Sequence, residues 1–141
     1  MKLFRTDIFD LPLPAEHRFP LAKYAELVRW VVESGELTAE LLVPDAASDE
    51  QLSLVHTPEY LAKIRSGDLS PLEVRRIGFP WSPPLVERSR RSVGGTIAAA
   101  LAAQREGFSG NLAGGTHHAF ADMGQGYCVF NDVAVAARVL Q

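Results

Sequence analysis

Two adjacent histidines, His117 and His118, are the residues of this chain whose type and setting best suit chemistry. They lie in the stretch GGTHHAFADMGQGYCVFND, which runs from Gly114 to Asp132 and has glycines on both sides of the pair. Histidine gains or loses a proton near neutral pH, so one ring can act as a base while the other carries a charge. The glycines leave room for a substrate or another backbone segment. The structural alternative is a Gly-Gly turn whose histidines only cap backbone groups.

Adjacent positions are a poor arrangement for chelating one metal ion. Neighbouring side chains of an extended segment point to opposite faces, whereas chelating histidines usually lie two residues apart on a strand or four apart on a helix. The nearest carboxylate, Asp122, is not at such a spacing. We therefore expect no complete metal site within this chain.

Other candidate residues have simpler explanations. The single cysteine, Cys128, excludes an intrachain disulfide and a cysteine-based zinc cluster. It is an alternative nucleophile, but its apolar surroundings, Tyr-Cys-Val-Phe, predict a buried strand. His56 is expected to be structural, Asp132 to complement a helix dipole, and His17 has no assigned role.

Composition excludes several kinds of partner. The 141 residues include 14 Lys and Arg against 17 Asp and Glu, a net charge of −3, so we expect no general attraction to nucleic acid or to anionic membranes. The densest basic run, residues 87–91, is interpreted as a solvated helix start. The longest apolar run, residues 97–103, is far shorter than the roughly 20 residues of a membrane span. With an N-terminus unlike a signal peptide, the expected location is cytoplasmic.

Helices are predicted from caps and apolar spacing, and two strands from short apolar runs. One domain of 141 residues is expected, but a parallel sheet needs more than two strands, so the chain is interpreted as the opening part of a larger α/β domain. The predicted strands are residues 2–5 and 111–113. The predicted helices start near Pro20, Ser48, Thr57, Ser70, Leu85 and Asn131, and the fifth of them runs to Glu106.

The histidine stretch and its flanks resemble a known family. The run from Asn111 to Ala137, NLAGGTHHAFADMGQGYCVFNDVAVAA, is similar to the tandem-histidine segment of the zinc-dependent histone deacetylases, most closely to bacterial deacetylase-like and class IV members. Three earlier segments agree with this resemblance: HRFPLAKY from His17, LVHTPEYL from Leu54 and FPWSPPLVERSRRSVGGTIAAA from Phe79. The likeness covers nearly the whole chain.

The resemblance implies a fold and a reaction. The fold would be the three-layer deacetylase/arginase-like α/β fold, an eight-stranded parallel sheet with helices on both faces, of which residues 1–141 would be the N-terminal portion. The reaction would be hydrolysis of an acyl-lysine or acylated polyamine-type amide by a zinc-activated water. The partner would then be such an acylated amine, with zinc as the cofactor of the whole domain.

The resemblance also implies residue roles. His118 would be the general base that takes the proton from the water and helps to protonate the leaving amine. His117 would stay largely protonated and stabilise the charge of the intermediate. Gly126 and Tyr127 would line a narrow acyl-lysine channel. The family usually has Phe in place of Tyr127, so this residue adds a hydroxyl that needs a partner.

Several family features do not occur before Gln141. The zinc ligands (an Asp-x-His pair and a later Asp), the carboxylates that orient the histidines and the tyrosine that polarises the carbonyl are all missing. We therefore expect the 141 residues alone to bind no catalytic zinc and to lack deacetylase activity. The alternative function is that of a truncated, non-catalytic remnant or interaction module. Either way, an exposed sheet edge predicts self-association.

Overall fold

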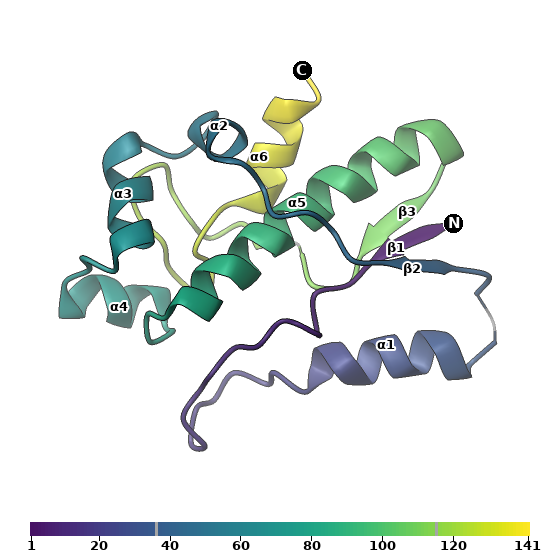
Figure 1. Ribbon diagram of the computed structural model, residues 1–141, viewed down its shortest axis with the longest axis horizontal. Helices are drawn as coiled ribbons and strands as arrows, with labels where there is room; N and C mark the ends of the chain where they lie inside the picture. Colours follow the sequence, from purple (N-terminus) through teal and green to yellow (C-terminus); the bar gives the residue numbers. More distant parts are fainter. Residues whose placement is uncertain (36, 115) are drawn as a thin grey trace.

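The computed structural model describes residues 1–35, 37–114 and 116–141 (Figure 1). Gly115, one of the glycines before the histidine pair, therefore lies outside the described residues. The elements follow one another as β1 (Lys2–Phe4), α1 (Lys23–Glu33), β2 (Glu40–Leu42), α2 (Asp49–Ser53), α3 (Pro58–Ser66), α4 (Pro71–Ile77), α5 (Pro83–Glu106), β3 (Ser109–Asn111) and α6 (Asp132–Val139).

The three strands form one parallel sheet in the order β2-β1-β3, with Leu3 opposite both Leu41 and Gly110. Parallel strands joined through helices are the expected α/β arrangement. Strand β2 was not predicted, because three residues are too few to show an alternating pattern. Strand β3 begins and ends two residues before the predicted strand at 111–113. Leu112 still donates its backbone N–H to the Phe4 carbonyl over 2.8 Å, and the chain then leaves the sheet.

Local capping determines where the helices begin. Ser48 and Ser70 each form a capping box with the residue three positions on, and Thr57 caps α3, as predicted. Helix α1 begins at Lys23 rather than near Pro20. Among the described residues, no helix is long and apolar enough to cross a membrane.

Helix α5 connects the sheet to the rest of the core. Phe4 of β1 packs with Ala99 and Ala102, and the main core gathers around side chains such as Val93 and Ile97. Figure 1 shows α1 and α5 on opposite sides of the sheet. Further along α5, Ala100 and Leu101 are not in the core, and Leu101 is exposed.

Gly94 allows α5 to touch the segment after β2. A Cβ atom at this position would overlap the backbone carbonyl oxygen of Asp45 and lie 3.3 Å from the backbone nitrogen of Ala47. Both obstacles are backbone atoms, so they cannot move aside as a flexible side chain can. The helix therefore needs glycine here.

We predict that Gly94→Ala destabilises the protein by roughly 1–3 kcal/mol, the usual cost of overpacking. In an unobstructed helix the same change would stabilise by about 0.5–1 kcal/mol. Chemical denaturation measures the difference. The control is Gln104→Ala on the exposed part of α5, for which little change is expected. A stabilised Gly94→Ala variant would contradict the predicted contact.

Candidate functional site

The histidine loop, residues 112–131, starts at the carboxyl end of β3 and leads into α6. In parallel α/β sheets, ligand sites form outside the carboxyl ends of the strands. All four predicted site residues, His117, His118, Gly126 and Tyr127, lie on this loop and are exposed. The loop has no helix or strand of its own within its described residues, so its shape depends on individual side-chain and backbone contacts.

A partly buried polar cluster anchors the first part of the loop. Asn111 donates to the Ser92 carbonyl (2.8 Å) and to Thr96 Oγ1 (2.9 Å). Thr96 in turn donates to the carboxylate of Asp132 over 3.0 Å. Gly114 lies directly on this cluster, because a Cβ atom there would be 2.5 Å from Thr96 Oγ1 and 2.9 Å from Asp132 Oδ2. One flanking glycine is therefore explained by close approach to α5 and α6.

The middle of the loop turns back on itself at Gly126 and Tyr127. Gln125 and Cys128 exchange two backbone hydrogen bonds of 3.0 Å each, and the two residues between them have φ values of 59° and 63°. Two successive left-handed residues are typical of a type I′ turn. Tyr127 is a costly residue at such a position, and its backbone N–H donates to the Ile77 carbonyl over 2.7 Å.

Aromatic contacts hold Tyr127 in place. Its ring lies 5.1 Å from both Phe19 and Phe79 and 6.0 Å from His17, measured between ring centroids. Tyr127 is 39% exposed, so water can hydrogen-bond to its hydroxyl group, which a Phe at this position would lack. His17, which had no assigned role, accepts from the Phe19 N–H at Nδ1 and therefore donates from Nε2 to the Gly78 carbonyl.

The structure brings the four predicted site residues together. The imidazole rings of His117 and His118 have centroids 4.4 Å apart and are tilted by 39°. A Cβ atom at Gly126 would lie 3.4–3.5 Å from His118, so the turn packs beside that ring. The expectation that the two rings point to opposite faces was wrong, because this segment is a loop and not a paired strand.

Cys128 lies in the second half of the loop, and its side chain is fully buried. Its Sγ accepts from the Ala119 N–H and donates to the Phe130 carbonyl. Burial raises the pKa of the thiol, which suppresses the reactive thiolate. The predicted burial is confirmed, but the predicted strand is not, since only an isolated bridge to Gln125 is formed. The cysteine is thus part of the loop's support and a poor nucleophile.

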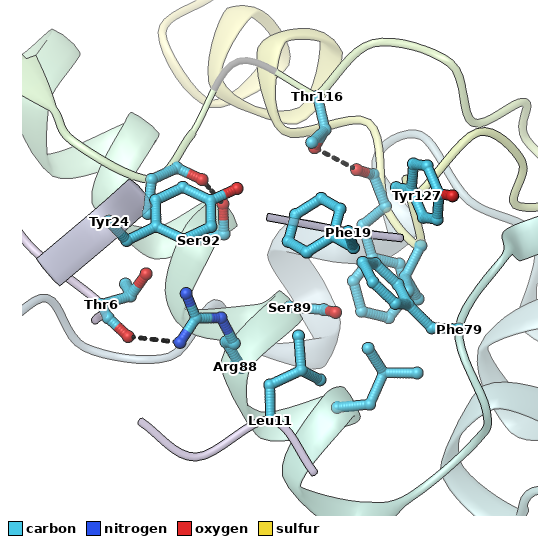
Figure 2. A pocket seen from close by; sticks show the side chains of 14 residues that line it. Thr6, Leu11, Phe19, Tyr24, Phe79, Arg88, Ser89, Ser92, Thr116 and Tyr127 are labelled. Carbon is cyan, nitrogen blue, oxygen red and sulfur yellow. Dashed lines mark hydrogen bonds between the residues drawn. The ribbon is translucent and has the colours of Figure 1, made fainter. Parts of the chain in front are cut away.

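A pocket of about 50 Å³ lies between the loop and α5 (Figure 2). Thr116 and Tyr127 line it from the loop, and Arg88 reaches in from α5. The guanidinium donates through Nη1 to the carbonyls of Thr6 (2.9 Å) and Phe9 (2.6 Å). Its Nη2 has no hydrogen-bond partner among the described residues, and burial lowers its pKa.

Arg88 contradicts the interpretation of residues 87–91 as a solvated helix start, because the residue is only 8% exposed. The sequence did contain a signal. Arg88 follows the buried Leu85 by three positions, which places both on the same face of a helix. The number of charges in the run predicted an exposed Arg88, whereas its helical spacing from Leu85 would have predicted a buried one.

His56 is a buried histidine that contacts the loop, and it was expected to be structural. It is 2% exposed, and its Nε2 accepts from the Asn131 N–H over 3.1 Å. Burial lowers the pKa of His56, although the backbone carbonyls of Ala121 and Phe120 oppose this effect by favouring the protonated ring. The neutral ring is the form that can accept from Asn131.

We predict a loss of stability between pH 7.5 and pH 5.5 that depends on His56. The folded-state pKa lies below the ordinary value of 6.5, so the folded protein is favoured above that value and loses stability as the pH falls through the lowered pKa. Thermal unfolding at pH 7.5 and 5.5 should show a Tm drop of a few degrees.

The matched variant is His56→Gln, which should unfold with a smaller difference between the two pH values. Carboxyl groups with lowered pKa values, such as Glu73 at about 2, lose their contribution only below their ordinary value of 4.5. They therefore act outside this window. An equal Tm drop in the variant would show that His56 is not the responsible group.

Comparisons with known proteins agree with the family resemblance seen in the sequence. Residues 17–141 match the histone deacetylase domain. An uncharacterized protein of Picosynechococcus is 44% identical over 131 residues, which cover 92% of this chain and 44% of that protein. Histone deacetylase 2 of Arabidopsis thaliana is 32% identical over 137 residues, covering 92% of this chain and 35% of that protein.

A solved structure agrees with the sequence relatives. The crystal structure of a histone deacetylase homolog from Aquifex aeolicus superimposes with a TM-score of 0.75 at 25% identity, over 99% of this chain and 40% of that one. The chain thus spans less than half the length of the relatives it matches. The three-stranded sheet with its helices is correspondingly a part of the deacetylase fold. The chain belongs to the histone deacetylase domain family.

Proposed function

We propose that this chain carries the proton-transfer part of an amide-hydrolase site that removes acyl groups from lysine-type or polyamine-type amines. The proposal rests on one arrangement: the rings of His117 and His118 lie 4.4 Å apart, beside the turn formed by Gly126 and Tyr127. Family membership supplies the reaction class. The arrangement supplies two exposed histidines that can carry protons, next to a turn that can contact the aliphatic chain of a substrate.

In the proposed reaction, His118 is the general base. It takes a proton from the attacking water as the new bond between oxygen and the acyl carbon forms, and it gives that proton to the amine nitrogen as the carbon–nitrogen bond breaks. The products are a carboxylic acid and a free amine, so atoms and protons balance. The His118 ring is exposed, so both the water and the amine nitrogen can reach it.

The neighbouring groups would stabilise charge and hold the substrate. His117, in its protonated form, would offset the negative charge that develops on the acyl oxygen. Gly126 leaves space against His118, and the ring of Tyr127 can cover the aliphatic part of an acyl-lysine. The packing of Tyr127 on Phe19 and Phe79 keeps this ring in a single orientation.

Zinc is the cofactor that we propose for the whole domain, where it would activate water as a Lewis acid. Among the residues that the structure describes, no three His, Cys, Asp or Glu side chains gather as a metal site. These residues therefore do not fit a zinc site by themselves. We accordingly expect the 141-residue chain, assayed alone, to show neither stoichiometric zinc nor turnover.

The function is tested on the protein expressed from the whole open reading frame that contains these codons. We expect hydrolysis of an acetyl-lysine peptide or of an acetylated polyamine. His118→Asn and His117→Asn should each lower kcat by about 100-fold or more. The comparison of the two substrates identifies the class of amine.

Two controls make the result specific. Gln104→Ala, on the exposed part of α5, should leave kcat unchanged, and Cys128→Ala should retain turnover if the cysteine is not a nucleophile. No turnover by the well-folded wild-type protein on either substrate would favour the non-catalytic remnant instead. Full activity of both histidine variants would exclude the assigned roles.

We also propose that the 141-residue chain, produced alone, self-associates through the outer edge of β3. Within the described residues, β3 pairs only with β1, and Phe108 immediately before it is 65% exposed. An unpaired strand next to an exposed aromatic ring favours pairing with a second copy. Light scattering should detect association that Phe108→Lys reduces, whereas a monodisperse wild-type monomer would contradict the proposal.

A further inference from the structure

The side chain of Asn131 connects the histidine pair to helix α6. Its Nδ2 donates to the backbone carbonyl of His117 over 3.3 Å and to that of Ala119 over 3.1 Å. Its Oδ1 accepts from the Ala134 N–H over 3.0 Å and so caps α6. One amide therefore holds the carbonyls on both sides of His118 and the start of a helix at the same time.

The hydrogen-bond network determines the orientation of this amide. Oδ1 faces an N–H donor, while Nδ2 faces two carbonyl acceptors. A flipped amide would place its N–H groups against the Ala134 N–H and its oxygen against two carbonyls, losing all three bonds. Asn131 is consequently locked, and both of its amide hydrogens are used by the histidine segment.

The backbone of Asn131 is fixed independently by the corner between α2 and α3. Its N–H donates to Nε2 of His56, whose ring packs 5.4 Å from Phe130 and 5.7 Å from Tyr60. Next to His56, the Thr57 N–H donates to the Ala121 carbonyl over 2.9 Å. The same corner thus holds the loop on both sides of its turn.

We propose that Asn131 is a positioning residue for His117 and His118, and that the anchoring of its backbone by His56 is part of this role. The proposal rests on the proposed function, since it assigns what keeps the two rings in working geometry. Proton transfer needs donor and acceptor atoms within hydrogen-bond reach, and a misplacement of about 1 Å can cost about 100-fold in rate. Asn131 acts through the two histidines and not on the substrate.

The test separates positioning from helix capping. Asn131→Ser and Asn131→Asp each keep an oxygen that can cap α6 but lack the amide that donates to the two carbonyls. The serine variant adds no charge beside the buried Asp132, so it covers the case in which the aspartate variant folds poorly. The control is Ser82→Ala, which removes the cap of α5 and leaves the histidine loop intact.

Hydrogen exchange of the loop is measured in the 141-residue chain, and kinetics in the protein from the whole reading frame. We expect exchange across residues 116–121 to rise about tenfold in both Asn131 variants. We expect kcat to fall about tenfold or more with KM within about threefold. Ser82→Ala should lower Tm without either change.

The outcomes distinguish failure of this inference from failure of the proposed function. Wild-type exchange in the loop of both Asn131 variants overturns the positioning role, whatever the activity. Faster exchange together with unchanged kcat also overturns it, because the carbonyl contacts would then not matter to the reaction. Absence of turnover in the wild-type protein overturns the proposed function, and the exchange result still decides whether Asn131 holds the histidine segment.

Discussion

The close approach of Gly114 to a partly buried polar cluster is the constraint on which the histidine loop depends. Asn111 ends β3, Thr96 lies in α5, and Asp132 begins α6, so the cluster joins the three elements that surround the loop. Its hydrogen bonds stabilise the buried carboxylate of Asp132, which would be costly to bury alone. A side chain at position 114 would displace the loop from this base and with it the two histidines.

Helix α6 is therefore more than a covering element. Its first residue, Asp132, is fully buried and bonded to α5, while the residue before it, Asn131, reaches outward to the carbonyls around His118. Two adjacent polar residues thus connect the start of one helix to the core on one side and to the site on the other. The capping residue of α6, whose effect is usually local to the helix, here also holds the backbone on both sides of His118.

Much of the fold was predictable because its signals are local. Ser48 and Ser70 each predicted a capping box from a span of four residues, and Asn131 predicted the start of α6. Strand β2 was missed because three residues carry no periodic signal, and its place depends on pairing with β1. Arg88 was misplaced because charge was weighed above helical spacing, and its burial depends on carbonyls about 80 positions away in the sequence.

The candidate site, like the fold, has features that the sequence predicts and features that only the tertiary structure determines. Residue types and adjacency alone indicated two proton-handling histidines and a glycine-rich loop, and a run of 27 residues, 111–137, was enough to indicate the family. The position of one ring beside the other, the turn at Gly126 and the support from His56 came only with the tertiary structure. Sequence spacing determines what a loop contains, but a loop without regular hydrogen bonding takes its shape from contacts with distant elements.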